Sequence, residues 1–273
     1  MFRRKMRVQV KSPEQIELMR VAGRLVGETL ALVSAAVKPG VSTKDLDRLA
    51  EENIRSNGGI PSFIGVPGPI TPFPATLCTS VNEEIVHCIP RDDKILRDGD
   101  IISIDCGAIV DGWHGDAAIT VPVGEVTPSV QKLLDVTEES LWRGMAACLV
   151  GATLGDIGHA IESYVRSQGR FGIVEGYGGH GIGTEMHMDP FIANVGQPGR
   201  GMKVGPGMVF AIEPMVNLGK PGTDELEDGW TVVTEDGKYS AHFEHTVAIT
   251  ESGPQVLTAL EDGTARIAKL NAS

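Results

Sequence analysis

The spacing of apolar and polar residues predicts two helices near the start of the chain. Residues 12–15 read Ser-Pro-Glu-Gln, with serine as a cap, proline in the first turn and glutamine at the capping-box position. Apolar residues then recur at helical spacing up to about residue 37, where Pro39-Gly40 ends the pattern. A second helix is predicted from Ser42 to about residue 56.

The second helix has an echo later in the chain. The stretch "GVSTKDLDRLAEENIRSNG" (40–58) aligns with "GATLGDIGHAIESYVRSQG" (151–169) at a constant offset of 111 residues. One explanation is a chance match between two capped amphipathic helices. The other, which we favour, is a duplicated half that is used twice and faces its copy across a cleft. The expected boundaries are 1–273 for a single domain, about 1–11 for an N-terminal segment, and about 12–124 and 125–250 for the halves.

Strand-like stretches follow each predicted helix pair, after a proline-rich loop over 61–74 in the first half. The pattern therefore predicts a helix pair followed by strands, used twice along the chain. The stretches lie near 76–81, 84–89, 99–121, 208–216, 230–234 and 239–250.

The segment 99–121 predicts a hairpin that brings two acidic residues together. Asp111-Gly112 is a strong two-residue turn signal. With that turn, Asp105 faces Ala118 and Asp116 faces Gly107, so the two aspartates are diagonal neighbours about 7 Å apart on one face. Their carboxylates would repel each other, and a bound divalent cation resolves the repulsion. Two exposed strand acids are the alternative, which fits poorly because Asp105 ends the apolar run "IISI".

Three further residues extend this pattern. Glu213 ends the apolar run "MVFAI", and Glu244 lies inside "SAHFEHTVAI". Each glutamate alone fits an ion pair as well as a metal ligand, since an unpaired buried carboxylate is costly. His180 lies among the glycines of "GYGGHGIG", which allow close backbone approach. Four carboxylates and one histidine suit two ions that share bridging carboxylates, with manganese, iron(II) and cobalt as eligible as zinc.

His180 and His187 are separated by seven residues, and we expect different roles for them. A metal–nitrogen bond is about 2.0–2.1 Å long, so two imidazoles on one ion must nearly touch. Seven residues span about 10 Å along a helix, and an odd spacing on a strand places side chains on opposite faces.

We expect both His114, after the hairpin turn, and His242 to face solvent.

Composition restricts the binding partners and the cellular compartment expected for the protein. A formal net charge of −12 argues against a surface that grips nucleic acid over its whole extent. Four cysteines without a C-x-x-C pair predict reduced thiols and a cytoplasmic protein. The basic start "MFRRKM" is followed by polar residues, and no apolar run reaches the roughly 18 residues of a membrane span, so we expect neither a signal peptide nor a membrane anchor.

Five motifs in order along the chain resemble those of type I methionine aminopeptidases of the short bacterial kind. They are "SVNEEIVHCIP" (80–90), "SIDCGAIVDGWHGD" (103–116), "GHGIGTEMH" (179–187), "FAIEPM" (210–215) and "FEHT" (243–246). The resemblance implies the "pita-bread" α+β fold, in which two pseudo-symmetric halves form a curved antiparallel sheet flanked by helices. It covers essentially the whole chain, which would be one catalytic domain.

The resemblance also implies the roles of the site residues and the reaction. A metal-activated water would remove the initiator methionine of nascent chains whose second residue is small, with two divalent ions (cobalt, manganese, iron(II) or zinc) bound. Glu213 would also shuttle the proton, and His87 and His187 would act on the substrate outside the metal shell. The implied metal ligands are Asp105, Asp116, His180, Glu213 and Glu244, of which Asp116 and Glu244 bridge.

The substrate pocket is less well defined by the resemblance. Cys78 and Trp230 match pocket positions, and Phe63 and Phe73 stand in for residues of a loop that is richer in proline than usual. Met186 lies where an aromatic residue often precedes the second histidine, and Gly107 lies where many bacterial members have threonine. We expect a monomer near ribosomes that binds nascent peptide N-termini, with no membrane and no specific nucleic acid as partner.

Two alternatives remain, one a related enzyme and the other a protein of a different functional class. Proline-specific peptidases such as aminopeptidase P or prolidase share this fold, but they usually carry a separate N-terminal domain for which this chain lacks the length. A pita-bread binding protein without its ligands is the other alternative, and metal content would distinguish it from an enzyme.

Overall fold

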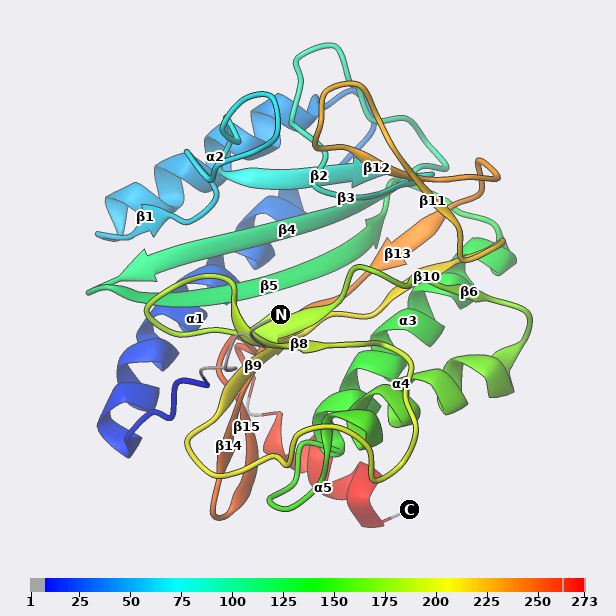
Figure 1. The fold of residues 1–273 in the computed structure, drawn as a ribbon. Coiled ribbons are helices and arrows are strands. Elements are labelled where there is room, and N and C mark those ends of the chain that lie inside the picture. Colours follow the sequence, from blue (N-terminus) through cyan, green and yellow to red (C-terminus); the bar gives the residue numbers. More distant parts are fainter. Residues whose placement is uncertain (1–7, 262, 273) are drawn as a thin grey trace.

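A computed structural model describes residues 8–261 and 263–272, which form a curved antiparallel sheet flanked by helices (Figure 1). The helices are α1 (Pro13–Ala36), α2 (Thr43–Ser56), α3 (Pro128–Ala146), α4 (Leu154–Gln168) and α5 (Thr264–Ala272). The strands are β1 (Ile60–Pro61), β2 (Leu77–Val81), β3 (Glu84–Val86), β4 (Ile101–Val110), β5 (Trp113–Pro122), β6 (Gly172–Ile173), β7 (Gly179–Gly181), β8 (Met188–Ile192), β9 (Val209–Ile212), β10 (Met215–Asn217), β11 (Thr223–Glu225), β12 (Val232–Thr234), β13 (Ser240–His242), β14 (Glu244–Thr250) and β15 (Gly253–Val256).

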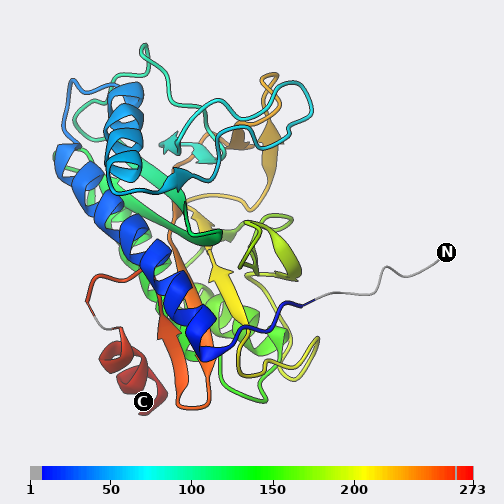
Figure 2. The same ribbon diagram turned by 90° about the vertical axis from the view of Figure 1, so that its left-hand side faces the viewer.

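A nine-stranded sheet forms the centre of the molecule. Its order is β1-β4-β5-β14-β9-β7-β8, with β2 paired to β4 and β15 paired to β14. Two three-stranded sheets, β13-β10-β6 and β11-β12-β3, extend from it. The long helix α1 runs along β4 and β5, as the side view in Figure 2 shows. The mixed α+β architecture predicted from the sequence is therefore confirmed.

The two segments of the sequence echo have the same local structure. Ser42 caps α2 and Thr153 caps α4, each through a capping box with an aspartate three residues on. The glycine before each cap has a positive φ, 91° at Gly40 and 89° at Gly151, which favours glycine. Both caps also form isolated antiparallel bridges, to Ile95 and Lys203 respectively. The domain boundaries and the division into halves remain a prediction.

One predicted strand ends earlier than the apolar pattern indicates, and two others divide in two. The stretch 84–89 stops at Val86, because His87 adopts a φ of 60° and turns the chain. The stretch 208–216 divides at Glu213-Pro214 into β9 and β10, since proline has no N–H for the ladder. The stretch 239–250 divides at Phe243 into β13 and β14.

Separate apolar clusters fill the space between the sheet and its helices. One cluster, with Leu46 and Ile104 among its members, lies between α1, α2 and the hairpin of β4 and β5. Another, with Phe210 and Leu141, lies under α3 and α4. Within residues 8–261 and 263–272, no helix is long and apolar enough to cross a membrane.

Candidate metal centre

The hairpin of β4 and β5 has the register that its sequence predicts. Asp111 and Gly112 form the turn with φ values of 49° and 79°, the conformation that favours an Asp-Gly pair. Asp105 is paired with Ala118, and Gly107 with Asp116. Because side chains two residues apart on a strand share a face, Asp105 and Asp116 are diagonal neighbours on one face of the sheet.

The next strand adds a third carboxylate to this face. Glu244 begins β14 and is paired with Ala118, the same residue that Asp105 faces from the other side. Asp105, Ala118 and Glu244 therefore form one row across three adjacent strands. The row explains why the three acids converge although Glu244 is far from the aspartates in sequence.

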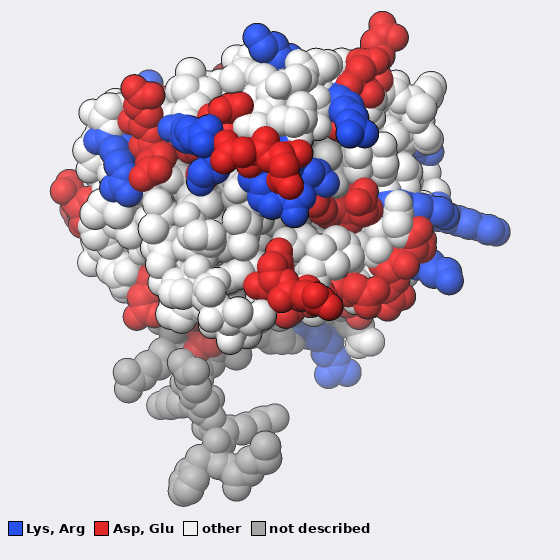
Figure 3. Space-filling view, turned by 90° about the horizontal axis from the view of Figure 1, so that it is seen from above, with Lys and Arg blue, Asp and Glu red and all other residues white. Residues whose placement is uncertain are grey.

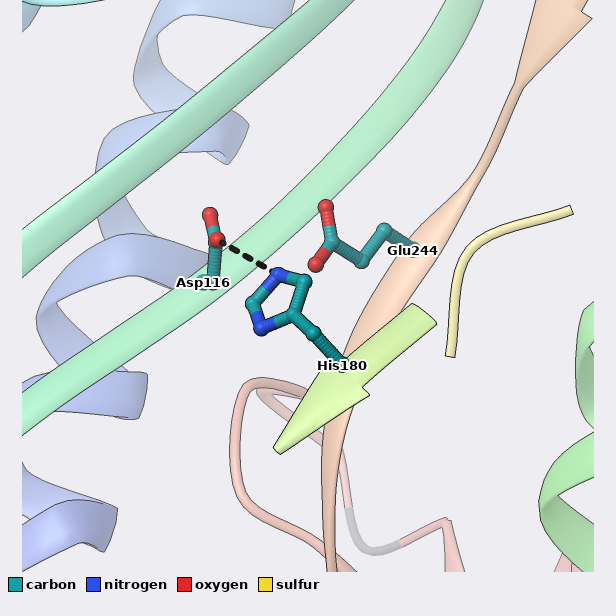
Figure 4. Close-up of side chains that lie close together, drawn as sticks. All are labelled: Asp116, His180 and Glu244. Atoms are coloured by element: carbon teal, nitrogen blue, oxygen red, sulfur yellow. Dashed lines mark ion pairs between the residues drawn. The ribbon is translucent and has the colours of Figure 1, made fainter. Parts of the chain in front are cut away.

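His180 and Glu213 complete the cluster from the following strands. His180 on β7 is paired with Ala211 on β9, and Glu213 follows directly after β9. The Nε2 atom of His180 lies 3.8 Å from Asp116 Oδ2 and 3.7 Å from Glu213 Oε1. Its Nδ1 atom lies 3.0 Å from the carbonyl oxygen of Gly181, which leaves Nε2 free for a ligand. Figure 4 shows Asp116, His180 and Glu244 directed toward one another.

Three carboxylate oxygens of this cluster are buried without hydrogen-bond partners. Asp105 Oδ1, Asp116 Oδ1 and Glu244 Oε1 are all excluded from solvent and unpaired. Burial raises the pKa of Asp105 to about 7, and burial together with neighbouring carboxylates raises the pKa of Asp116 and of Glu244 well above the usual range. Buried carboxylates in this state fit a divalent cation, which supplies both the missing charge and the missing contacts.

Two overlapping groups of side chains could each hold an ion. Asp116, His180 and Glu244 form one, and Glu213, His242 and Glu244 form the other, with the ligand atoms of each group within 4.8 Å of one another. Glu244 belongs to both groups, as a bridging carboxylate does in two-ion sites. Oxygen donors with one or two imidazoles suit a first-row divalent cation.

The position of His242 differs from the sequence-based expectation. His242 was expected in solvent, but it is 1% exposed and its Nε2 atom has no hydrogen-bond partner. His242 belongs to β13, which pairs with β10 and packs against α3, β3, β4 and β5. The Nε2 atom lies 3.5 Å from Glu213 Oε2. Burial alone would raise the pKa of Glu213, but the contacts with His242 and His180 outweigh burial and lower it.

His114 was also expected in solvent, and that expectation is wrong as well. The residue is buried, and its Nδ1 atom lies 3.2 Å from Ser62 Oγ. Its backbone N–H donates to the carbonyl of Gly183 at 2.9 Å. The loop that joins His180 to His187 is thereby attached to the hairpin that carries Asp116.

A cavity of about 670 Å³ opens over the cluster. Its walls include His87 and His187, together with Asp116, His180, Glu213 and Glu244 of the cluster. His187 is exposed to this space, and its ring centroid lies 4.5 Å from that of His180. His87 is held with a φ of 60°, a strained conformation that concentrates at functional sites. Tyr177 and Phe191 also line the cavity.

The predicted substrate residues gather in one apolar cluster beside the acids. Phe63, Phe73, Cys78 and Met186 are buried together, and Trp230 packs against them. The ring of Phe73 lies 5.0 Å from that of Trp230, which in turn lies 6.5 Å from His87. Cys78 is paired across β2 and β4 with Asp105. The apolar cluster therefore adjoins the group of candidate metal ligands, Asp105, Asp116, His180, Glu213 and Glu244, which is called the metal cluster below. The apolar residues themselves do not line the 670 Å³ cavity.

Comparisons with known proteins agree with this geometry. The model of metallopeptidase family M24 matches residues 17–251. The methionine aminopeptidase of Clostridium acetobutylicum is 51% identical over 92% of this chain and 99% of its own length. Methionine aminopeptidase 1 of Mycobacterium tuberculosis is 50% identical over 92% of this chain and 95% of its own length.

Solved structures give the same result. The methionine aminopeptidase of Thermotoga maritima has a TM-score of 0.89 at 41% identity, covering 93% of this chain and 100% of that one. The prolidase of Pyrococcus horikoshii has a TM-score of 0.72 at 19% identity, covering 92% of this chain and 64% of that one, and it shows the fold alone. The chain therefore belongs to metallopeptidase family M24 and, within it, to the bacterial type I methionine aminopeptidases.

Proposed function

We propose that the protein is a metal-dependent aminopeptidase that removes the initiator methionine from nascent chains whose second residue is small. The observation that carries this proposal is the convergence of Asp105, Asp116, His180, Glu213 and Glu244 from consecutive strands of one sheet. The unpaired buried oxygens of Asp105, Asp116 and Glu244 would contribute to an oxygen-rich site for two divalent ions, which we take to be cobalt, manganese, iron(II) or zinc. Two ions in such a site polarise a carbonyl and lower the pKa of water.

The chain's own residues then position the substrate and move the proton. Glu213 faces the cavity and accepts the proton that the attacking water releases, and it passes that proton to the leaving amine. His187 donates a hydrogen bond to the substrate amide from the cavity wall. His87 stabilises the charge that develops on the carbonyl oxygen.

The apolar cluster beside the metal centre is the proposed methionine site. Phe63, Phe73 and Trp230 offer aromatic surface, and Cys78 and Met186 offer sulfur, which together suit a flexible thioether. The second substrate residue would lie between the metal cluster and His187. The separation of His180 and His187 ring centroids by only 4.5 Å leaves little room there, which favours a small residue.

We also propose that the protein works as a cytoplasmic monomer close to ribosomes, where nascent N-termini emerge. The four cysteines are all unpaired and buried, as suits a reducing compartment. Acidic and basic side chains are interspersed on the face shown in Figure 3, rather than segregated into a basic surface for nucleic acid. We expect neither a membrane nor a specific nucleic acid as partner.

A ranked peptide panel tests the activity. Protein loaded with cobalt or manganese should cleave Met-Ala-Ser. It should also cleave norleucine-Ala-Ser, because an apolar pocket separates side chains one methylene apart by only about 1–3 kcal/mol. It should cleave Met-Leu-Ser poorly, since the second residue must be small, and it should reject the charged side chain of Lys-Ala-Ser. The variant Asp116→Asn should lose activity, and the matched change Asp111→Asn in the exposed turn should not. Comparable kcat/KM for Leu-Ala-Ser and Met-Ala-Ser would refute the methionine specificity. Cleavage of X-Pro peptides regardless of X would indicate a proline-specific enzyme.

A further inference from the structure

His242 is fixed rigidly beside the metal cluster. It ends β13, two residues before Glu244, and it is paired with Met215 on β10. Its backbone N–H donates to Thr120 Oγ1 at 2.9 Å, and the Thr120 hydroxyl donates back to the His242 carbonyl at 2.7 Å. These contacts tie its main chain to β5, the strand that carries Asp116.

The imidazole of His242 points at two of the candidate ligands. Its Nε2 atom lies 3.5 Å from Glu213 Oε2 and 3.9 Å from Glu244 Oε2. The side chain is 2% exposed, and Nε2 is buried with no hydrogen-bond partner. A buried ring nitrogen without a partner is unfavourable unless something else satisfies it.

These separations fit two ligands of one ion better than they fit a hydrogen bond. A charge-assisted N–H···O contact has a length of about 2.7–2.9 Å. Two donor atoms that each lie about 2.1 Å from an ion are about 3.4 Å apart at the tetrahedral angle. The His180 Nε2 atom has the same kind of spacing, 3.8 Å to Asp116 and 3.7 Å to Glu213. Glu213 therefore has one oxygen toward each histidine.

We propose that His242 Nε2 is a further metal ligand, on the ion that Glu213 and Glu244 hold. Each of the two ion positions then carries one imidazole, His180 at one and His242 at the other, with Glu244 shared. Four carboxylates already balance the charge of two divalent ions, so an additional ligand should be neutral, as an imidazole is. This inference rests on the metal centre of the proposed function.

The chemistry of the added ligand predicts a metal preference. An imidazole nitrogen favours cobalt and zinc over manganese, whose sites are built mainly from oxygen. The variant His242→Gln keeps a side chain of similar reach that can donate a hydrogen bond to Glu213, but it removes the ring nitrogen. We expect its affinity for the second cobalt ion to fall at least tenfold, and its affinity for manganese to change less.

Proton NMR of the cobalt(II)-loaded protein counts the histidine ligands directly. Each imidazole bound through Nε2 places its Nδ1–H close to the paramagnetic ion, which gives one strongly shifted, exchangeable signal. We expect two such signals from the unchanged protein with two cobalt ions, one from His242→Gln, and two from the control His245→Gln. His245 is a suitable control because it belongs to neither group of candidate ligands and forms a hydrogen bond with Thr258, whose Oγ1 atom lies 2.8 Å from His245 Nδ1.

One shifted signal in the unchanged protein at full cobalt occupancy would overturn the inference. The same would follow from two signals in His242→Gln, since His242 would then only orient Glu213. The count in the unchanged protein does not depend on the folding of any variant. Methionine-peptide cleavage with a single signal would leave the proposed function intact, whereas a protein that binds no cobalt would overturn both.

Discussion

Replacing Asp105 by asparagine should stabilise the protein when no metal is bound. Burial raises the pKa of the Asp105 carboxyl to about 7 from the ordinary 3.8, and its Oδ1 atom has no partner. The unfolded chain therefore ionises Asp105 at a lower pH than the folded chain does. Below pH 3.8 the group costs nothing; the free energy of unfolding then falls as the pH rises, and the full cost is reached above pH 7.

The size of the effect follows from that pKa difference. At about 1.4 kcal/mol for each pH unit, the raised pKa of Asp105 lowers the free energy of unfolding of the metal-free protein by about 2 kcal/mol at pH 5 and by about 4 kcal/mol at pH 8. Asparagine has nearly the same shape and carries no charge. The metal-free variant Asp105→Asn should therefore exceed the unchanged protein in stability by a margin that grows by about 2 kcal/mol between pH 5 and pH 8.

Metal should reduce the stability advantage of the variant. A free ion concentration of 100 times Kd adds about 2.7 kcal/mol to the free energy of unfolding for each site. Asp105→Asn lacks one ligand, so the same ion concentration should stabilise it less. The variant should be the more stable protein in chelator and should gain less from added cobalt.

Guanidinium denaturation at pH 5 and at pH 8, each with chelator and with cobalt, measures the free energy of unfolding of both proteins under these four conditions. Asp111→Asn is the matched control, because it makes the same chemical change in the exposed turn of the same hairpin. Its φ of 49° suits asparagine as well as aspartate. If Asp105→Asn and the unchanged protein lose stability in parallel between pH 5 and pH 8 in chelator, then Asp105 is not the buried carboxyl described here.

Three further changes have defined outcomes. His187→Ala should keep its metal content but lose about 10²–10³ in kcat, the usual cost of one transition-state hydrogen bond, as steady-state kinetics and elemental analysis would show. Gly107→Ala places a Cβ 2.5 Å from Met186 Cε and 2.9 Å from Phe63 Cε1, so kcat/KM for Met-Ala-Ser should fall about tenfold through KM. Burial lowers the pKa of Lys11 to about 8 from 10.5; the unfolded chain binds more protons between these values, so urea denaturation should show stability rising with pH over that range by about 3 kcal/mol, and Lys11→Met should abolish that rise.

Each of these outcomes has a clear contrary. Loss of metal from His187→Ala, with kcat restored when metal is added, would place His187 among the ligands; His159→Ala, on the exposed side of α4, is the control. An unchanged KM in Gly107→Ala would place the methionine side chain elsewhere. The same stability gain toward alkaline pH in Lys11→Met as in the unchanged protein would assign that gain to other groups.

Local rules were sufficient to predict the first half of the metal cluster. The turn signal at Asp111-Gly112 sets the register, and the two-residue period of a strand then fixes the relation of Asp105 to Asp116. No long-range information is needed for that step. His242 and Glu244 are two residues apart in the predicted strand 239–250, so the same two-residue period places both side chains on one face of that strand. This spacing was a signal that His242 lies beside the cluster, and considering His242 by itself missed it.

The burial of His242 and His114 depends on contacts that no local rule supplies. Thr120 reaches His242 from a strand 122 residues earlier in the sequence. His114 contacts Ser62 Oγ at 3.2 Å, 52 residues earlier in the sequence, and its backbone N–H donates to the carbonyl of Gly183, far later in the sequence. A polar residue next to a turn is usually exposed, and only the packing of distant elements removes it from solvent.

The metal cluster lies across the junction between the two predicted halves. Asp105 and Asp116 come from the first, and His180, Glu213 and Glu244 come from the second, while β5 and β14 meet in only two paired positions, Glu244 with Ala118 and His245 with Ala117. Without an ion, carboxylates from both sides repel each other across this short ladder. A bound cation turns that repulsion into a cross-link, because each ligand then contacts the ion instead of another charge. The side chains that would hold the ions would therefore also link the two predicted halves of the sheet, in addition to the hydrogen bonds of this ladder.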